Sequence, residues 1–164
     1  MIRIATPADI DAVVAIYNQA IESSFQTAFM QPLSVEERRS WFNGHIDPAY
    51  PIFVYVADEK VVGWLSIGPY RSGREALRFI VEVSYYLDTE YQGRGIGSAL
   101  LAHSIHACKA LGYKDLIAII LEKNIISIKL MKKFGFTQWA HLPAIANFNG
   151  LECGQVYYGL RLSL

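Results

Sequence analysis

The sequence carries no excess of charge of either sign, because 15 Lys and Arg residues balance 15 Asp and Glu residues among 164. A general nucleic-acid-binding protein needs surplus Lys and Arg to neutralise phosphates, so the balance argues against that class. Long hydrophobic runs are missing too: the longest aliphatic run, Leu116 to Leu121, falls far short of the roughly 20 residues that cross a bilayer. We expect no membrane span, and any anion that binds must be held by a local arrangement of residues.

Cysteine is scarce in this sequence: Cys108 and Cys153 have no C-x-x-C spacing, and a reducing compartment would keep them as free thiols. The first residues, Met1 to Pro7, lack the apolar stretch of a signal peptide, so we expect a cytoplasmic protein. His103 and His106 share a predicted helix with Cys108, but no fourth residue is spaced to complete a metal site. We therefore expect no metal.

Hydrophobic residues make up 52% of the chain, which predicts one domain over residues 1–164 with a sizeable core. Apolar residues at helical spacing follow two capping sequences, Thr6-Pro7-Ala8-Asp9 and Ser34-Val35-Glu36-Glu37, and predict two helices. Two more helices are predicted over 95–111 and 124–134, and strands over 2–4, 52–57, 61–67, 79–87, 116–121, 137–142 and 154–162. The stretch from Ser23 to Leu33 has no clear period and is either a lid over the core or a wall of a substrate site.

The predicted strand over 79–87 alternates between two kinds of side chain. Its odd positions are mostly apolar, while Glu82, Ser84 and Tyr86 lie on the opposite face. Glu82 therefore stands in the middle of a strand. Such a carboxylate faces solvent, pairs with a cation such as Arg78, or serves in acid/base chemistry.

The most informative segment is Gln92-Gly93-Arg94-Gly95-Ile96-Gly97-Ser98, between a predicted strand and a predicted helix. Glycines let the backbone approach a ligand and turn several N–H donors in one direction. A helix N-terminus adds partial positive charge, so the segment favours a phosphate or pyrophosphate. Arg94 can add a local charge, and a glycine-rich turn without a ligand is the alternative.

A dinucleotide-binding unit is a second interpretation of this segment. Its fingerprint needs G-x-G-x-x-G directly after the strand, whereas here the spacing is G-x-G-x-G and Asp88 to Gln92 intervene. Glu122, at the end of the next predicted strand, supplies an acid for a ribose, but the chain leaves no room for the rest of such a domain. A P-loop is excluded because no Gly-Lys-Ser/Thr follows.

Four stretches together, Ile16-Tyr17-Asn18, Val81 to Leu87, Gln92 to Gly97 and Asn124 to Phe136, resemble the GCN5-related N-acetyltransferases. Gln92 to Gly97 fits the Q/R-x-x-G-x-G/A form of that family's coenzyme A loop. The other three stretches are similar to the subgroup that acetylates phosphinothricin and methionine sulfoximine. The resemblance implies a mixed α/β fold with about seven strands and four helices, and acetyl-CoA as cosubstrate.

The resemblance also implies where the coenzyme binds. Backbone groups of Tyr85, Tyr86 and Leu87 would pair with the pantetheine arm, as an added strand does at a sheet edge. Asn124 would bind the coenzyme further along, and it can also cap the helix that follows it. The pyrophosphate would be held by Gln92, Gly93, Arg94, Gly95, Ile96, Gly97 and Ser98.

Glu82 is the predicted catalytic residue, and the subgroup carries glutamate at this position. An acceptor amine arrives mainly as ammonium and attacks a thioester only after losing a proton, which a carboxylate with a raised pKa can take directly or through water. Many family members place a tyrosine seven residues after the capping asparagine to protonate the leaving sulfur, but here that residue is Met131. Either no donor is required, or water or one of four tyrosines serves: Tyr85, Tyr86, Tyr157 or Tyr158.

The resemblance implies that the acceptor contacts Arg71, Ser72 and Gly73 in a loop. It implies further contacts with Glu82, Val83 and Ser84 on the strand. Arg71 can bind an α-carboxylate through two hydrogen bonds. Family members often carry Trp-His-Asp before the last strand, whereas this chain has Glu152-Cys153-Gly154. That departure weakens the case for phosphinothricin itself more than the case for another small amino acid or analogue.

The predicted function is transfer of the acetyl group of acetyl-CoA to the amine of such an acceptor, by direct attack in a ternary complex. A different amine, such as a peptide N-terminus or a polyamine, is one alternative. A non-catalytic acetyl-CoA sensor is another. The resemblance also implies a homodimer, with which the aromatic content of 13% is consistent.

Overall fold

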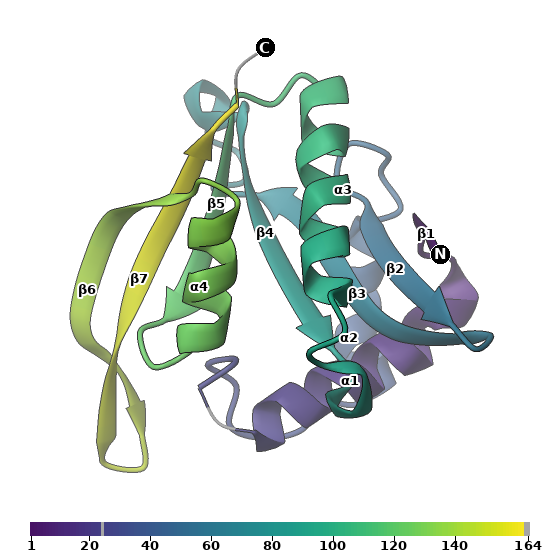
Figure 1. The fold of residues 1–164 in the computed structure, drawn as a ribbon, viewed down its shortest axis with the longest axis horizontal. Helices are drawn as coiled ribbons and strands as arrows, with labels where there is room; N and C mark the ends of the chain where they lie inside the picture. The colour runs from purple at the N-terminus through teal and green to yellow at the C-terminus, as the bar shows by residue number, and fades with distance from the viewer. Residues whose placement is uncertain (24, 163–164) are drawn as a thin grey trace.

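A seven-stranded mixed sheet forms the centre of the computed structural model, which describes residues 1–23 and 25–162 (Figure 1). Within those residues the strand order is β1-β2-β3-β4-β5-β7-β6, and β4 and β5 run parallel. The strands are β1 (Ile2–Ile4), β2 (Ile52–Ala57), β3 (Lys60–Pro69), β4 (Ile80–Leu87), β5 (Asp115–Leu121), β6 (Thr137–Phe148) and β7 (Leu151–Arg161). The α-helices are α1 (Ile10–Glu22), α2 (Val35–Gly44), α3 (Ile96–Ala110) and α4 (Ile125–Lys133). In the described part of the chain, none of the helices has the length and apolar character that a membrane span requires.

This architecture confirms the predicted mixed α/β fold. The second capping sequence forms as expected at the start of α2. There the N–H of Glu37 donates to the Ser34 hydroxyl at 3.2 Å, and the N–H of Ser34 donates to the Glu37 carboxylate at 2.6 Å. Each contact satisfies a donor that a helix start would otherwise leave without a partner.

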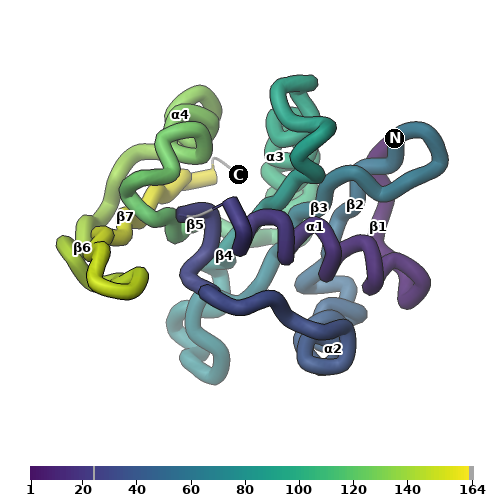
Figure 2. The backbone as a smooth tube through the Cα atoms, turned by 90° about the horizontal axis from the view of Figure 1, so that it is seen from below, coloured from purple at the N-terminus to yellow at the C-terminus, as the bar shows by residue number. Residues whose placement is uncertain are grey.

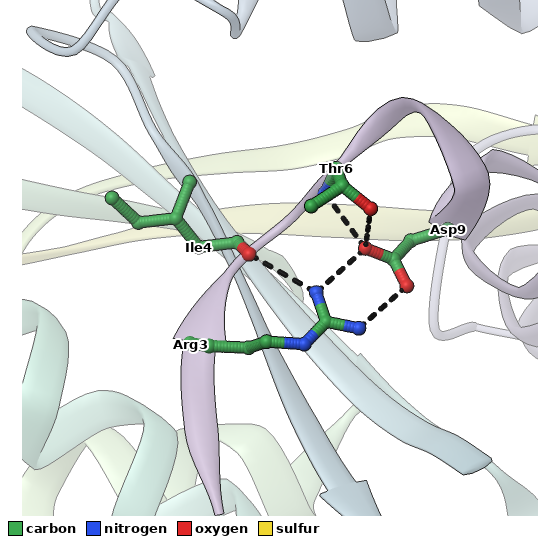
Figure 3. A network of polar contacts seen from close by, with 4 residues as sticks. All are labelled: Arg3, Ile4, Thr6 and Asp9. Atoms are coloured by element: carbon green, nitrogen blue, oxygen red, sulfur yellow. Dashed lines mark hydrogen bonds and ion pairs between the residues drawn. The ribbon is translucent and has the colours of Figure 1, made fainter. Parts of the chain in front are cut away.

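The first capping sequence also forms as predicted, with Thr6 as the N-cap and Asp9 at N3, but the turn that it opens, Pro7–Asp9, is a short 3₁₀ turn that leads into α1. The Asp9 carboxylate is almost completely buried and accepts hydrogen bonds from the Thr6 N–H at 2.7 Å and from both Arg3 Nη atoms at 2.7 and 2.8 Å (Figure 3). The hydrogen bonds from Arg3 lower the pKa of Asp9 from 3.8 to about 2. This contact fixes β1 to the start of α1.

Helices cover both faces of the sheet (Figure 2). The α1 and α2 side packs against Val54 and Trp64, and the indole N–H of Trp64 donates to the Val13 carbonyl at 3.0 Å. The α3 and α4 side packs against Leu65 and Val83. The alternation along β4 therefore directs Val83 to one side of the sheet and its neighbours in sequence to the other.

The parallel strands β4 and β5 pair over three residues of β4, Ile80 to Glu82, and then separate. Beyond that point β4 stays paired with β3 as far as Leu87, while β5 stays paired with β7. The two strands therefore diverge, as Figure 1 shows, and their backbone edges face each other without pairing.

The C-terminal hairpin is longer than the sequence predicted. A loop was expected between residues 142 and 154, whereas β6 and β7 continue to a turn at Asn149-Gly150, where both residues have positive φ. The pairing register shifts between Leu142 and Ala146, and Ala144 has a φ of +53°. These irregularities break the alternation of side chains, which is why the strand pattern was missed there.

Candidate active site

The separation of β4 and β5 leaves a cavity of about 310 Å³ between them. Its walls come from Val83 to Leu87 of β4 and from Ala118 to Ile120 of β5, and Asn124, Ser127 and Met131 line it from α4 and its cap. The other lining residues are Gln26, Gln92, Gly93 and Ile126. The cavity thus joins the glycine-rich turn to the segment that follows α1, and it offers a free strand edge to an extended ligand.

The glycine-rich turn has the geometry of an anion site. Gly93 and Gly95 have φ of +74° and +80°, and no atom lies within 4 Å of where a Cβ would be. Because α3 begins at Ile96, the N–H groups of its first turn have no acceptor within the helix, and they carry the positive end of its dipole. Gly97 differs, since a Cβ there would lie 3.3 Å from the Tyr85 ring. Its role is close packing.

The predicted residues Tyr85 and Asn124 meet on the α4 side of the cavity. The Tyr85 hydroxyl and the Ser127 Oγ lie 2.9 Å apart, and the Ser127 N–H donates to the Asn124 side chain at 3.2 Å. Asn124 therefore caps α4 and lines the cavity, as the sequence allowed. Met131 is buried and also lines the cavity.

Glu82 lies where β4 and β5 part, on the face of β4 that turns toward α1 and α2. Burial raises the pKa of this carboxyl above 4.5, and the charge of Arg71 offsets part of the rise. The alternative partner, Arg78, instead donates to the Glu75 carbonyl at 3.0 Å. Glu82 is thus half-buried beside Arg71, which suits a group that accepts a proton.

His45 was not predicted from the sequence as a site residue, and it lies next to Gly68. The Nε2 of His45 is 3.7 Å from the position that a Cβ of Gly68 would take, and Gly68 is the cross-strand partner of Glu82. Directly opposed residues place their Cβ positions about 5 Å apart on one face, so the imidazole lies on the same face of the sheet as the Glu82 side chain. His45 Nδ1 lies 2.8 Å from the Trp41 carbonyl, which assigns the proton to Nδ1 and leaves Nε2 as an acceptor.

Of the six predicted acceptor contacts, Glu82 lines neither of two cavities, and the other five are divided between them. Val83 and Ser84 line the main one, whereas Arg71, Ser72 and Gly73 line a neighbouring cavity of about 230 Å³ next to Tyr50. Val83 itself is buried in the core. The residues of the second cavity are linked to β4 by the charge of Arg71, which lowers the pKa of Glu82.

The chain matches the Acetyltransferase (GNAT) family over residues 17–136. The chain belongs to the GNAT family. Among its relatives are YwnH of Bacillus subtilis, 38% identical over 99% of both chains, and the L-methionine sulfoximine/L-methionine sulfone acetyltransferase of Salmonella typhimurium, 31% identical over 88% of this chain and 84% of the relative. The crystal structure of a GNAT superfamily phosphinothricin acetyltransferase from Sinorhizobium meliloti in complex with acetyl-CoA has a TM-score of 0.93 at 30% identity, covering 99% of this chain and 88% of the other.

Membership of the GNAT family identifies the chain as an acetyltransferase, and the dinucleotide alternative is wrong. The structure places Glu122 in a different role. Its carboxylate accepts a hydrogen bond from the Gly154 N–H at 2.7 Å and lies 2.7 Å from His141 Nε2. A Cβ at Gly154 would collide with it. Glu122 thus fixes the end of β5 to the C-terminal hairpin.

The possible ligand set His103, His106 and Cys108 does not converge. Cys108 is fully buried and burial raises its pKa to about 12, whereas both histidines are exposed on α3. Over the described ranges, no three His, Cys, Asp or Glu side chains gather in a group that could hold a metal ion.

Proposed function

We propose that this GNAT enzyme transfers the acetyl group of acetyl-CoA to the amine of a small amino acid or amino-acid analogue. The acceptor class rests on the relatives that act on methionine sulfoximine, methionine sulfone and phosphinothricin. The observation that carries the proposal is the position of Glu82, in the last residue pair before β4 and β5 separate and next to Val83, where the cavity wall begins. A thioester lying along β4 would reach Glu82 from one side and an acceptor from the other.

For the coenzyme, the backbone edge of Tyr85, Tyr86 and Leu87 would pair with the pantetheine amides. Gln92, Arg94 and the glycine-rich turn would hold the pyrophosphate with the first N–H groups of α3, including that of Ser98. Arg94 Nη2 donates to the Glu90 carbonyl at 2.9 Å, so its charge is held beside the turn. Asn124 would contact the coenzyme near the cap of α4.

For the chemistry, Glu82 takes a proton from the acceptor ammonium, directly or through a water molecule. The free amine then attacks the thioester carbonyl in a ternary complex, and the tetrahedral intermediate is stabilised by backbone N–H groups of β4. Tyr85 is the proton donor to the leaving thiolate, because it lines the cavity and its hydroxyl is held there beside Ser127. Tyr157 and Tyr158 are not among the residues that line the cavity.

For the acceptor, Arg71 with Ser72 and Gly73 would bind the α-carboxylate, which lies next to the amine, while Val83 and Ser84 border the reacting groups. Residues 1–164 would act as one catalytic domain in the cytoplasm. We expect a homodimer, because Trp139, Ile145 and Leu151 on the C-terminal hairpin are 46%, 57% and 50% exposed. Light scattering that finds a monomer at micromolar concentration would refute the dimer.

The test is release of free coenzyme A thiol from acetyl-CoA with a panel of amines. The panel contains methionine sulfoximine, methionine sulfone, phosphinothricin, common amino acids, a polyamine and a peptide. We expect turnover with the amino acids and amino-acid analogues, and little turnover with the polyamine and the peptide. Preference for the polyamine or the peptide supports the different-amine alternative, and tight acetyl-CoA binding without turnover supports the sensor.

A further inference from the structure

Arg38, on α2, is a half-buried arginine that packs against two aromatic rings. The guanidinium carbon of Arg38 lies 3.9 Å from the centroid of the Trp41 ring and 4.8 Å from that of the Tyr17 ring. Its side chain is half-buried, yet among residues 1–23 and 25–162 it makes neither an ion pair nor a hydrogen bond. Arg3 and Arg39, by contrast, each pair with a carboxylate.

This arrangement suits a ligand whose oxygens accept hydrogen bonds. Burial lowers the pKa of Arg38, but a guanidinium remains charged in proteins. The guanidinium contacts two aromatic rings, which attract its charge but accept no in-plane hydrogen bonds from its N–H donors. Half-buried N–H donors without acceptors are costly, and an oxygen-bearing ligand that accepts hydrogen bonds from them would offset part of that cost.

Arg38 lies next to the main cavity. The Tyr17 ring stands edge-on to the Tyr86 ring at 4.8 Å, and Tyr86 lines the cavity. The Tyr17 hydroxyl lies 2.6 Å from the Thr27 Oγ1, and Tyr17 and Tyr86 both partly offset the lowering of the Arg38 pKa by burial. Arg38 and three hydroxyl groups thus form a polar cluster that reaches the cavity wall at Tyr86. The hydroxyls are those of Tyr17, Thr27 and Tyr86.

The direction of helix α2 places Arg38 and His45 at opposite ends of the proposed acceptor site. Arg38, Trp41 and His45 fall at helical spacing on one face, and seven residues of helix span about 10 Å. His45 lies over Gly68, the cross-strand partner of Glu82, and the charge of Arg38 acts on Tyr86, which lies on the same face of β4 as Glu82. An amino acid with its amine at Glu82 would therefore extend its side chain along Trp41 toward Arg38.

We propose that Arg38 determines acceptor specificity by binding an oxygen-bearing group at the far end of the acceptor side chain, such as a sulfone, sulfoximine or phosphinate oxygen. This inference rests on the proposed function and deepens it, because it separates two tasks. Arg71 binds the α-carboxylate beside the amine, and Arg38 selects the side chain. An acceptor without that terminal oxygen leaves Arg38 unpaired, and it is acetylated less efficiently.

The test compares methionine sulfone with methionine, which has the same carbon chain without the oxygens. We expect wild-type kcat/KM to favour the sulfone by about 10- to 100-fold, and Arg38→Met to lower this ratio toward one, mainly through the KM of the sulfone. Arg39→Met is the matched control, since Arg39 pairs with Glu36 and should leave the ratio unchanged. Acetyl-CoA affinity should stay within about threefold of wild type in both variants, a change of less than 1 kcal/mol.

Arg38→Lys keeps the charge but loses the planar fork, and it should give an intermediate ratio even if Arg38→Met does not fold. Equal wild-type kcat/KM for the sulfone and methionine overturns the inference. So does a ratio that is the same in wild type and in the folded Arg38 variants. Both results leave the proposed function standing, whereas absence of turnover with every amino acid and analogue overturns the proposed function and the inference with it.

Discussion

The hydroxyl of Tyr85 and the Oγ of Ser127 lie 2.9 Å apart, and this hydrogen bond joins β4 to the first turn of α4 across the cavity. Met131, one turn further along α4, lines the same cavity and supplies no proton. We therefore propose that the Tyr85 hydroxyl supplies the proton that a tyrosine at position 131 would otherwise supply.

Replacing Tyr85 by Phe removes this donor and keeps the ring that packs against Gly97. We expect kcat to fall by about 10- to 100-fold with acetyl-CoA affinity nearly unchanged. Ser127→Ala, which removes the partner and leaves the phenol in place, should have a smaller effect. Unchanged kcat in Tyr85→Phe would instead indicate that water protonates the thiolate or that the thiolate leaves without a proton.

The raised pKa of Glu82 should appear in the pH dependence of the reaction. The base form is required, so kcat/KM should fall on the acid side with an apparent pKa above the ordinary 4.5. Removing the opposing charge with Arg71→Met should move this limb to higher pH, since Arg71 lowers the pKa of Glu82. A limb at or below 4.5, or a shift toward lower pH in Arg71→Met, would contradict the assignment.

The left-handed conformation of Gly95 should matter for coenzyme binding as well as for stability. Alanine at a φ of +80° costs about 1–2 kcal/mol and turns the N–H groups at the start of α3. We expect Gly95→Ala to raise the Kd for acetyl-CoA about tenfold by calorimetry. Gly73→Ala, at a φ of +75° outside this turn, is the control. It should lower stability to a similar degree without changing that Kd.

The contact of Arg3 with Asp9 should make stability depend on pH. Because the pKa of Asp9 is lowered from 3.8 to about 2, its ionised form contributes about 2 kcal/mol to the free energy of unfolding above pH 4. That contribution declines as the pH falls from 4 to 2. Urea unfolding of wild type and Asp9→Asn at pH 7 and pH 3 measures it. A difference between the two proteins that is as large at pH 3 as at pH 7 would contradict the lowered pKa.

The local features of the site were predictable from the sequence. The alternation of side chains along β4 predicted that Glu82 lies on the face opposite Val81 and Val83. The glycines predicted the turn before α3, and Asn124 was predicted as the N-cap of α4. Each depends on residues a few positions apart, whose conformational preferences act locally.

The remaining features depend on contacts between distant segments. The parting of β4 and β5 follows from their pairing with β3 and β7, which no local pattern reveals. The positions of Arg38 and His45 depend on how α2 packs over the sheet. The family resemblance assigned Arg71 and Ser84 to one acceptor site, yet in the structure they line two different cavities.

The most direct test of the account is the steady-state rate of thiol release by Glu82→Gln at saturating acetyl-CoA, with methionine sulfone as the acceptor. Glutamine keeps the shape of the side chain and cannot take a proton, so we expect kcat/KM to fall by about 10²-fold or more at pH 7 while the Kd for acetyl-CoA stays the same. The acid limb of the pH profile should disappear with it. A variant that matches wild-type kcat/KM across the pH range would contradict the central claim that Glu82 is the base.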